Sequence, residues 1–131
     1  MNLGLQEYIK AWLQKAEHDL MSEQRLIEIE PMILDNACFH CQQAIEKSLK
    51  AFLCYNLKNI EKTHDIDYLL SECSSFDDVF STIDTLNINV YAVLGRYPDT
   101  NLMPDKEEPA KFYKIALQIN SMVKERIVFK Y

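Results

Sequence analysis

The side chains best suited to chemistry lie in residues 39–53, where polar groups recur at spacings of three and four. This stripe consists of His40, Gln43, Lys47 and Lys50. On a helix such spacing places the side chains on one face. Lysine binds phosphate as a point charge, and an amide can hydrogen-bond the edge of a base. The stripe therefore predicts part of a nucleotide or phosphate site, although a solvated helix face with a Glu46–Lys50 ion pair would explain it without a ligand.

Arg96 and Tyr97 are the second set of candidate binding residues, in a stretch interrupted by Gly95 and Pro98. A guanidinium can hold a phosphate through two parallel hydrogen bonds, and a neighbouring aromatic ring can stack on a base. Arg96 would be explained equally well if it capped the carbonyl groups of the preceding helix and paired with Asp99. Both interpretations remain open from the sequence.

His64 stands between Thr63 and Asp65, immediately before an apolar stretch that begins at Ile66. Its imidazole could donate a hydrogen bond to a ligand. Thr and Asp are typical helix-capping residues, so the sequence favours a role for His64 in the cap.

The four cysteines do not form a metal site by their spacing. Cys38 and Cys41 are three residues apart, but Cys54 and Cys73 stand alone, whereas a structural zinc site takes four ligands. Cys38 and Cys41 share a helical face with Ile45, where a thiol behaves as a small apolar group. We therefore expect buried, reduced cysteines, no metal and no other cofactor.

Apolar periodicity indicates the elements that position these residues. It predicts helices over residues 5–29, 35–56, 66–73, 76–94 and 106–129. Pro31 ends the first of them, because proline has no N–H and disfavours helix at the residue before it. Short connections between long helices favour antiparallel neighbours. The expected fold is all-α, an up-and-down antiparallel bundle of four long helices plus one short helix.

Composition limits the class of protein. The 131 residues suffice for one domain spanning 1–131, and the net charge of −6 excludes a general affinity for nucleic acid. Two segments are nevertheless basic: residues 37–64 carry four basic and two acidic side chains, and residues 111–131 carry five and one. Neither a signal peptide nor a membrane-spanning apolar stretch is visible, so we expect a cytoplasmic protein.

Four motifs together resemble those of the HEPN domain, the "higher eukaryotes and prokaryotes nucleotide-binding" family. They are residues 12–20 (WLQKAEHDL), 39–51 (FHCQQAIEKSLKA), 62–66 (KTHDI) and 96–99 (RYPD). Each motif is weak alone, but they occur in the order of the family and cover nearly the whole chain. The last one is similar to the branch of the family with an Arg-Tyr-Pro-Asp loop.

The resemblance implies a helical bundle like that of kanamycin nucleotidyltransferase, usually a homodimer, that acts beside a separate minimal nucleotidyltransferase. Some such pairs are toxin–antitoxin systems. Ribonucleases of the family use an Arg and a His separated by four to six residues. After Arg96 the required positions are Asn101, Leu102 and Met103, and after Arg25 they are Glu30, Pro31 and Met32, while Arg126 is too near the end of the sequence. We therefore expect the pair to be absent and in-line RNA cleavage to lack its acid–base partner.

We therefore predict a dimeric HEPN-class bundle that binds a nucleotide or RNA phosphate and has no catalytic activity of its own. The hypothetical ligand-binding residues are Arg96, Tyr97, Gln43, Lys47, Lys50 and His64. One alternative is a metal-independent ribonuclease toxin with a rearranged site that uses His40 or His64 with Arg96. Another is a non-catalytic dimerisation module. Convergence of Arg96, Lys47 and His64 on one cleft would favour ligand binding.

Overall fold

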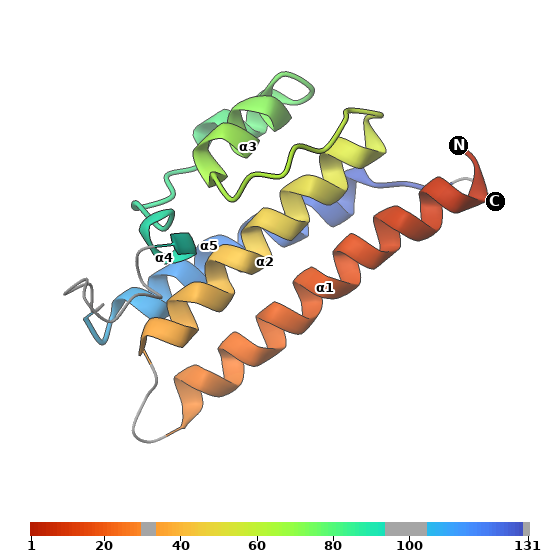
Figure 1. Ribbon diagram of the computed structural model, residues 1–131. Helices are drawn as coiled ribbons and strands as arrows, with labels where there is room; N and C mark the ends of the chain where they lie inside the picture. Colours follow the sequence, from red (N-terminus) through yellow and green to blue (C-terminus); the bar gives the residue numbers. More distant parts are fainter. Residues whose placement is uncertain (30–33, 94–104, 130–131) are drawn as a thin grey trace.

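The computed structural model describes residues 1–29, 34–93 and 105–129, and within them the chain is helical without any strand (Figure 1). The elements in chain order are α1 (Leu3–Glu28), α2 (Leu34–Tyr55), α3 (Ile66–Ser74), the 3-10 helix η1 (Asp78–Thr82), α4 (Val90–Val93) and α5 (Glu108–Arg126). The prediction of an all-α bundle is confirmed.

Helix α2 is the centre of the bundle, because α1, α3, α4 and α5 all pack against it (Figure 1). Its predicted apolar face is fully buried at Cys41, Ile45 and Leu49, and almost fully at Phe52. Residues on its other sides, including Ala51, are buried as well. A helix enclosed on several sides also carries its polar residues into partly buried surroundings, and this determines the character of the site described below.

A capping side chain and a proline mark the starts of two of the long helices. The Asn2 side chain accepts a hydrogen bond from Leu5 N at 2.7 Å and so caps α1. Pro109 occupies the first turn of α5, where a missing N–H has no consequence. The inner face of α5 is formed by Phe112, Ala116, Ile119 and Val123, all buried. The long helices predicted near 5–29, 35–56 and 106–129 are thus confirmed to within a few residues.

The prediction of one continuous helix over 76–94 is wrong. The segment forms the short η1, a turn and the four-residue α4 instead. Leu86 and Asn87 have positive φ angles of 53° and 61°, which a right-handed helix does not permit. Side chains in this segment compete for the backbone: the Thr82 hydroxyl donates to Val79 O at 2.7 Å, and Asp84 accepts from Leu86 N at 2.9 Å.

The cysteines lie in the core as expected. Cys38, Cys41, Cys54 and Cys73 are all buried and none forms a disulfide. Within the described residues, no group of three or more His, Cys, Asp or Glu side chains is arranged to hold a metal ion. The described helices also lack any stretch both long and apolar enough to cross a membrane.

Candidate functional site

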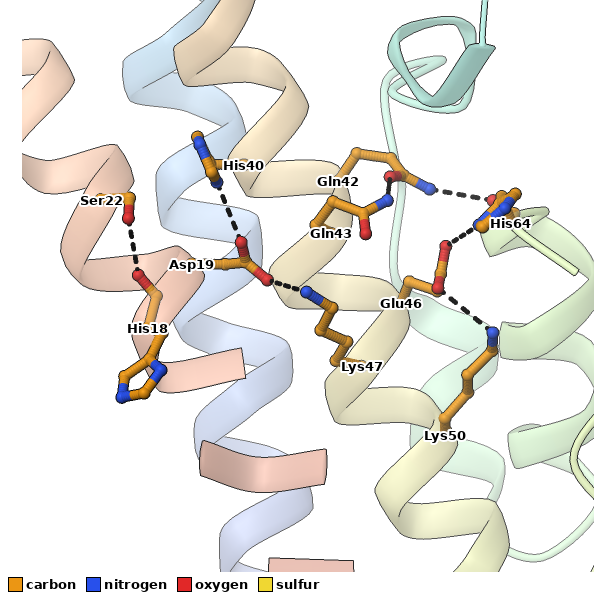
Figure 2. A network of polar contacts seen from close by, with 10 residues as sticks. All are labelled: His18, Asp19, Ser22, His40, Gln42, Gln43, Glu46, Lys47, Lys50 and His64. Carbon is orange, nitrogen blue, oxygen red and sulfur yellow. Dashed lines mark hydrogen bonds and ion pairs between the residues drawn. The ribbon is translucent and has the colours of Figure 1, made fainter. Parts of the chain in front are cut away.

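A polar network joins α1 to α2 through the carboxylate of Asp19 (Figure 2). His40 Nδ1 donates to Asp19 Oδ1 at 2.9 Å, and Lys47 Nζ donates to Asp19 Oδ2 at 2.6 Å. Both oxygens of this buried carboxylate are therefore occupied by groups seven residues apart on α2. Burial alone would raise the pKa of Asp19, but the hydrogen bonds from His40 and Lys47 outweigh it and hold the pKa below its ordinary value.

A second carboxylate of the same kind lies further along α2. Glu46 Oε1 accepts from His64 Nδ1 at 2.7 Å, and Glu46 Oε2 accepts from Lys50 Nζ at 3.2 Å. The side chains of Glu46 and Lys50 are only 4% and 6% exposed, whereas that of His64 is 61% exposed. Each carboxylate therefore binds one lysine and one histidine, and the histidines extend the network toward solvent.

Two amides link the network to the segment before α3. Gln42 Nε2 donates to His64 O at 2.9 Å, and Gln43 Nε2 donates to Gln42 Oε1 at 2.6 Å (Figure 2). Gln42 is fully buried, so these bonds satisfy polar atoms that would otherwise be orphaned. The network thus holds α1, α2 and the approach to α3 in fixed positions.

The formal charges of the network cancel, since Lys47 and Lys50 offset Asp19 and Glu46. A buried ion pair must offset the loss of hydration of both partners, so it is a weak source of stability. The ion pairs mainly fix the positions of the side chains that form them. The lysine and histidine side chains are held in one conformation by their carboxylates, and the donors that the carboxylates leave unused are fixed in space.

The structure decides several of the sequence predictions. The Glu46–Lys50 pair is confirmed, but the solvated helix face is wrong for Lys50, which is buried. The expected capping role of His64 is also wrong: Asp65 caps α3 by accepting from Tyr68 N at 3.2 Å, while His64 binds Glu46. Both differences have the same cause, the packing of four helices around α2. This packing buries Lys50, and it places the segment before α3 so that His64 contacts Glu46 of α2.

Gln43, Lys50 and His64 are joined through Gln42 and Glu46, whereas Lys47 belongs to a separate set of contacts around Asp19. Arg96 and Tyr97 lie outside the described residues, so their convergence with Lys47 stays a prediction. The sequence reasoning missed Asp19, which is 21 residues from His40 in the chain. The available signal was its place in the segment WLQKAEHDL, where an acidic residue interrupts the apolar face of the first helix.

A separate acidic side chain, Glu23, lies fully buried in α1 beside Cys41 of α2. In the described part of the chain neither carboxylate oxygen has a hydrogen-bond partner by ordinary criteria. Burial raises the pKa of Glu23 to about 8, and the weak thiol donor of Cys41 offsets little of this effect. At neutral pH this group is therefore mostly a neutral acid, distinct from the ionised Asp19 one helical turn away.

The protein is thus an all-α bundle whose central helix carries carboxylate–lysine–histidine contacts. The family model for the HEPN domain matches residues 9–126, and the chain belongs to this family. The fold is similar to the crystal structure of an archaeal HEPN homologue, with a TM-score of 0.65 and 21% sequence identity over 92% of this chain and 98% of that one. None of the curated proteins matches the chain.

Proposed function

We propose that this HEPN-domain protein is a homodimeric nucleotide-binding accessory subunit that acts with a separate minimal nucleotidyltransferase, as in a toxin–antitoxin pair. Membership of the HEPN family supports the proposal. The observation that carries it is the arrangement of Lys47 and His40 on Asp19, next to Gln43 on the same helix. The partner would catalyse transfer, and this chain would supply the binding surface.

Unused hydrogen-bond donors make a phosphate ligand plausible in chemical terms. A lysine ammonium has three N–H donors, and Asp19 accepts only one from Lys47, whose side chain is 22% exposed. His40 donates to Asp19 through Nδ1, so its Nε2 would donate to a phosphate only when the ring is protonated on both nitrogens. A phosphate oxygen could therefore bind without displacing the carboxylate, and the side chains would lose little conformational entropy because they are already fixed.

Calorimetric titration with nucleoside mono-, di- and triphosphates tests the proposal. Replacing Lys47 with Met retains the aliphatic chain and removes the charge, so we expect affinity to fall about tenfold or more, as for loss of one charge-assisted hydrogen bond. Lys58→Met is the matched control, because Lys58 also pairs with a glutamate, Glu72, at 3.2 Å but lies outside the network. Absence of binding by any nucleotide, or equal losses in both variants, would contradict the proposal.

The partner and the dimer need separate measurements. We expect co-expression with a minimal nucleotidyltransferase encoded in the adjacent reading frame to yield a stable complex on size-exclusion chromatography. Sedimentation of the chain alone should give the mass of a homodimer. A monomer that forms no complex with such a protein would remove this part of the proposal.

The Asp19–His40 contact favours ribonuclease activity as the second candidate. A carboxylate on Nδ1 fixes the imidazole and leaves Nε2 for proton transfer, an arrangement suited to general acid–base catalysis. This candidate predicts RNA cleavage in the presence of a chelator and its loss in His40→Gln. Intact RNA under those conditions would exclude it.

A further inference from the structure

The outer surface of α1 carries a small groove lined by aromatic and basic side chains. Its lining consists of Tyr8, Ala11, Trp12 and Lys15, and its volume is about 210 Å³. Tyr8 is 51% exposed and Trp12 is half-buried. The two rings meet edge to face, with their centroids 6.0 Å apart and an angle of 73° between their planes. A half-exposed aromatic pair of this kind is available to a flat ligand.

One ring of the groove, that of Trp12, lies near the Glu46–Lys50 ion pair. Lys50 Nζ, which binds Glu46, lies 5.5 Å from the centroid of the Trp12 ring. Lys15 is four residues before Asp19 and therefore lies on the same side of α1, one turn away. In the described part of the chain Lys15 has no ion-pair partner. From Trp12 to Asp19 the helix rises roughly 10 Å, at about 1.5 Å per residue.

The size and charge of the groove select among possible occupants. A volume of about 210 Å³ accommodates the flat ring system of a one- or two-ring heterocycle. One exposed lysine, Lys15, lines the groove beside the aromatic rings, whereas Lys50 is buried and bound to Glu46. Lysine is depleted in protein–protein interfaces. The combination favours a small anionic aromatic ligand over a second copy of the chain.

We propose that this groove is a stacking subsite for the base of a nucleotide whose phosphates extend along α1 toward Lys15 and Lys47. The assignment of the phosphate end rests on the function proposed above. Aromatic stacking is tolerant of sequence because every base has a π-face. We therefore expect binding of all four common bases with modest preferences among them.

Trp12 is the single tryptophan of the chain, so its fluorescence reports on the groove directly. Titration with AMP, GMP, CMP and UMP should quench this fluorescence, while ribose 5-phosphate, which lacks a base, should not. Calorimetry on Tyr8→Ala should show nucleotide affinity reduced about five- to hundredfold, the range for loss of one stacked base. Phe76→Ala, at an exposed ring remote from the groove, is the matched control and should bind normally.

The outcomes separate this inference from the function on which it rests. If nucleotides bind in a Lys47-dependent way while Trp12 fluorescence and the affinity of Tyr8→Ala are unchanged, the stacking subsite is overturned and the proposed function stands. Equal quenching by ribose 5-phosphate also overturns it. A lower sedimenting mass of Tyr8→Ala with normal nucleotide binding would assign the groove to a second copy of the chain. If no nucleotide binds, both proposals fail.

Discussion

The buried carboxyl of Glu23 makes the stability of the fold dependent on pH. In the folded chain its pKa is about 8, against an ordinary value of 4.5. The folded state therefore retains a proton that the unfolded state releases between these two values, so stability is fully present below pH 4.5 and falls as the pH rises to 8. At about 1.36 kcal/mol per pH unit, the loss reaches roughly 3 kcal/mol at pH 7, a large part of the 5–15 kcal/mol typical of a domain.

Urea unfolding of the wild type and of Glu23→Gln at pH 5, 6, 7 and 8 measures this effect. The glutamine cannot ionise, so the free energy of unfolding of the variant should decline less steeply with pH, by about 1.4 kcal/mol per unit. The absolute stability at pH 5 matters less, because a buried amide without partners is itself unfavourable. The difference between the two slopes isolates the carboxyl.

Glu28→Gln provides the matched control, since Glu28 is exposed near the end of the same helix. It makes the same chemical substitution at an exposed position and should leave the slope of the wild type unaltered. Parallel pH profiles for the wild type and Glu23→Gln would show that Glu23 does not take up a proton on folding. The physical account of its burial would then be wrong.

Three further outcomes follow from the network and the core. Glu46→Gln leaves the buried ammonium of Lys50 without its counter-charge and should lower the free energy of unfolding by about 3–5 kcal/mol in urea titrations; a loss below about 1 kcal/mol would contradict the burial of this pair. Asp19→Asn should destabilise the fold by roughly 1–3 kcal/mol at neutral pH, and because the pKa of Asp19 is lowered from 3.8, the difference from wild type should shrink as the pH falls through and below that value. Burial raises the pKa of the Cys41 thiol, so alkylation followed by mass spectrometry should find it protected in the native protein and modified in urea; rapid native labelling would be inconsistent with its position in the core.

The long helices could be predicted from the sequence because each has an apolar face that local spacing reveals. The face containing Cys41, Ile45 and Leu49 is one example, and all three residues are buried. The polar stripe of α2 was visible for the same reason. That Lys47 and Lys50 share this stripe follows from their spacing, since a helix fixes which residues lie on one face. Their role in binding a ligand stays a prediction.

The partners of the stripe could not be predicted in the same way. Asp19 meets His40 and Lys47 only when α1 packs on α2, and Glu46 meets His64 across a connection of irregular structure. Such pairs depend on tertiary packing and leave no periodic pattern. The break of the expected 76–94 helix had a local signal, its Ser, Thr, Asp and Asn residues, but an apolar period compatible with helix outweighed it.

The attachment of His64 to α2 bears on how far the connection between α2 and α3 can vary in length. The carbonyl and the ring of His64 are both held by α2, through Gln42 and Glu46, and Ile66 N donates to Asn89 Oδ1 at 2.7 Å. The start of α3 therefore has attachments that do not depend on the length of the connection over residues 56–62. An insertion there would cost loop-closure entropy, about 0.6 kcal/mol for each doubling in length, and in addition any of the contacts Lys58–Glu72 and Tyr68–Glu61 that it displaced. We expect natural variants to differ in the length of this connection while they conserve its two points of attachment.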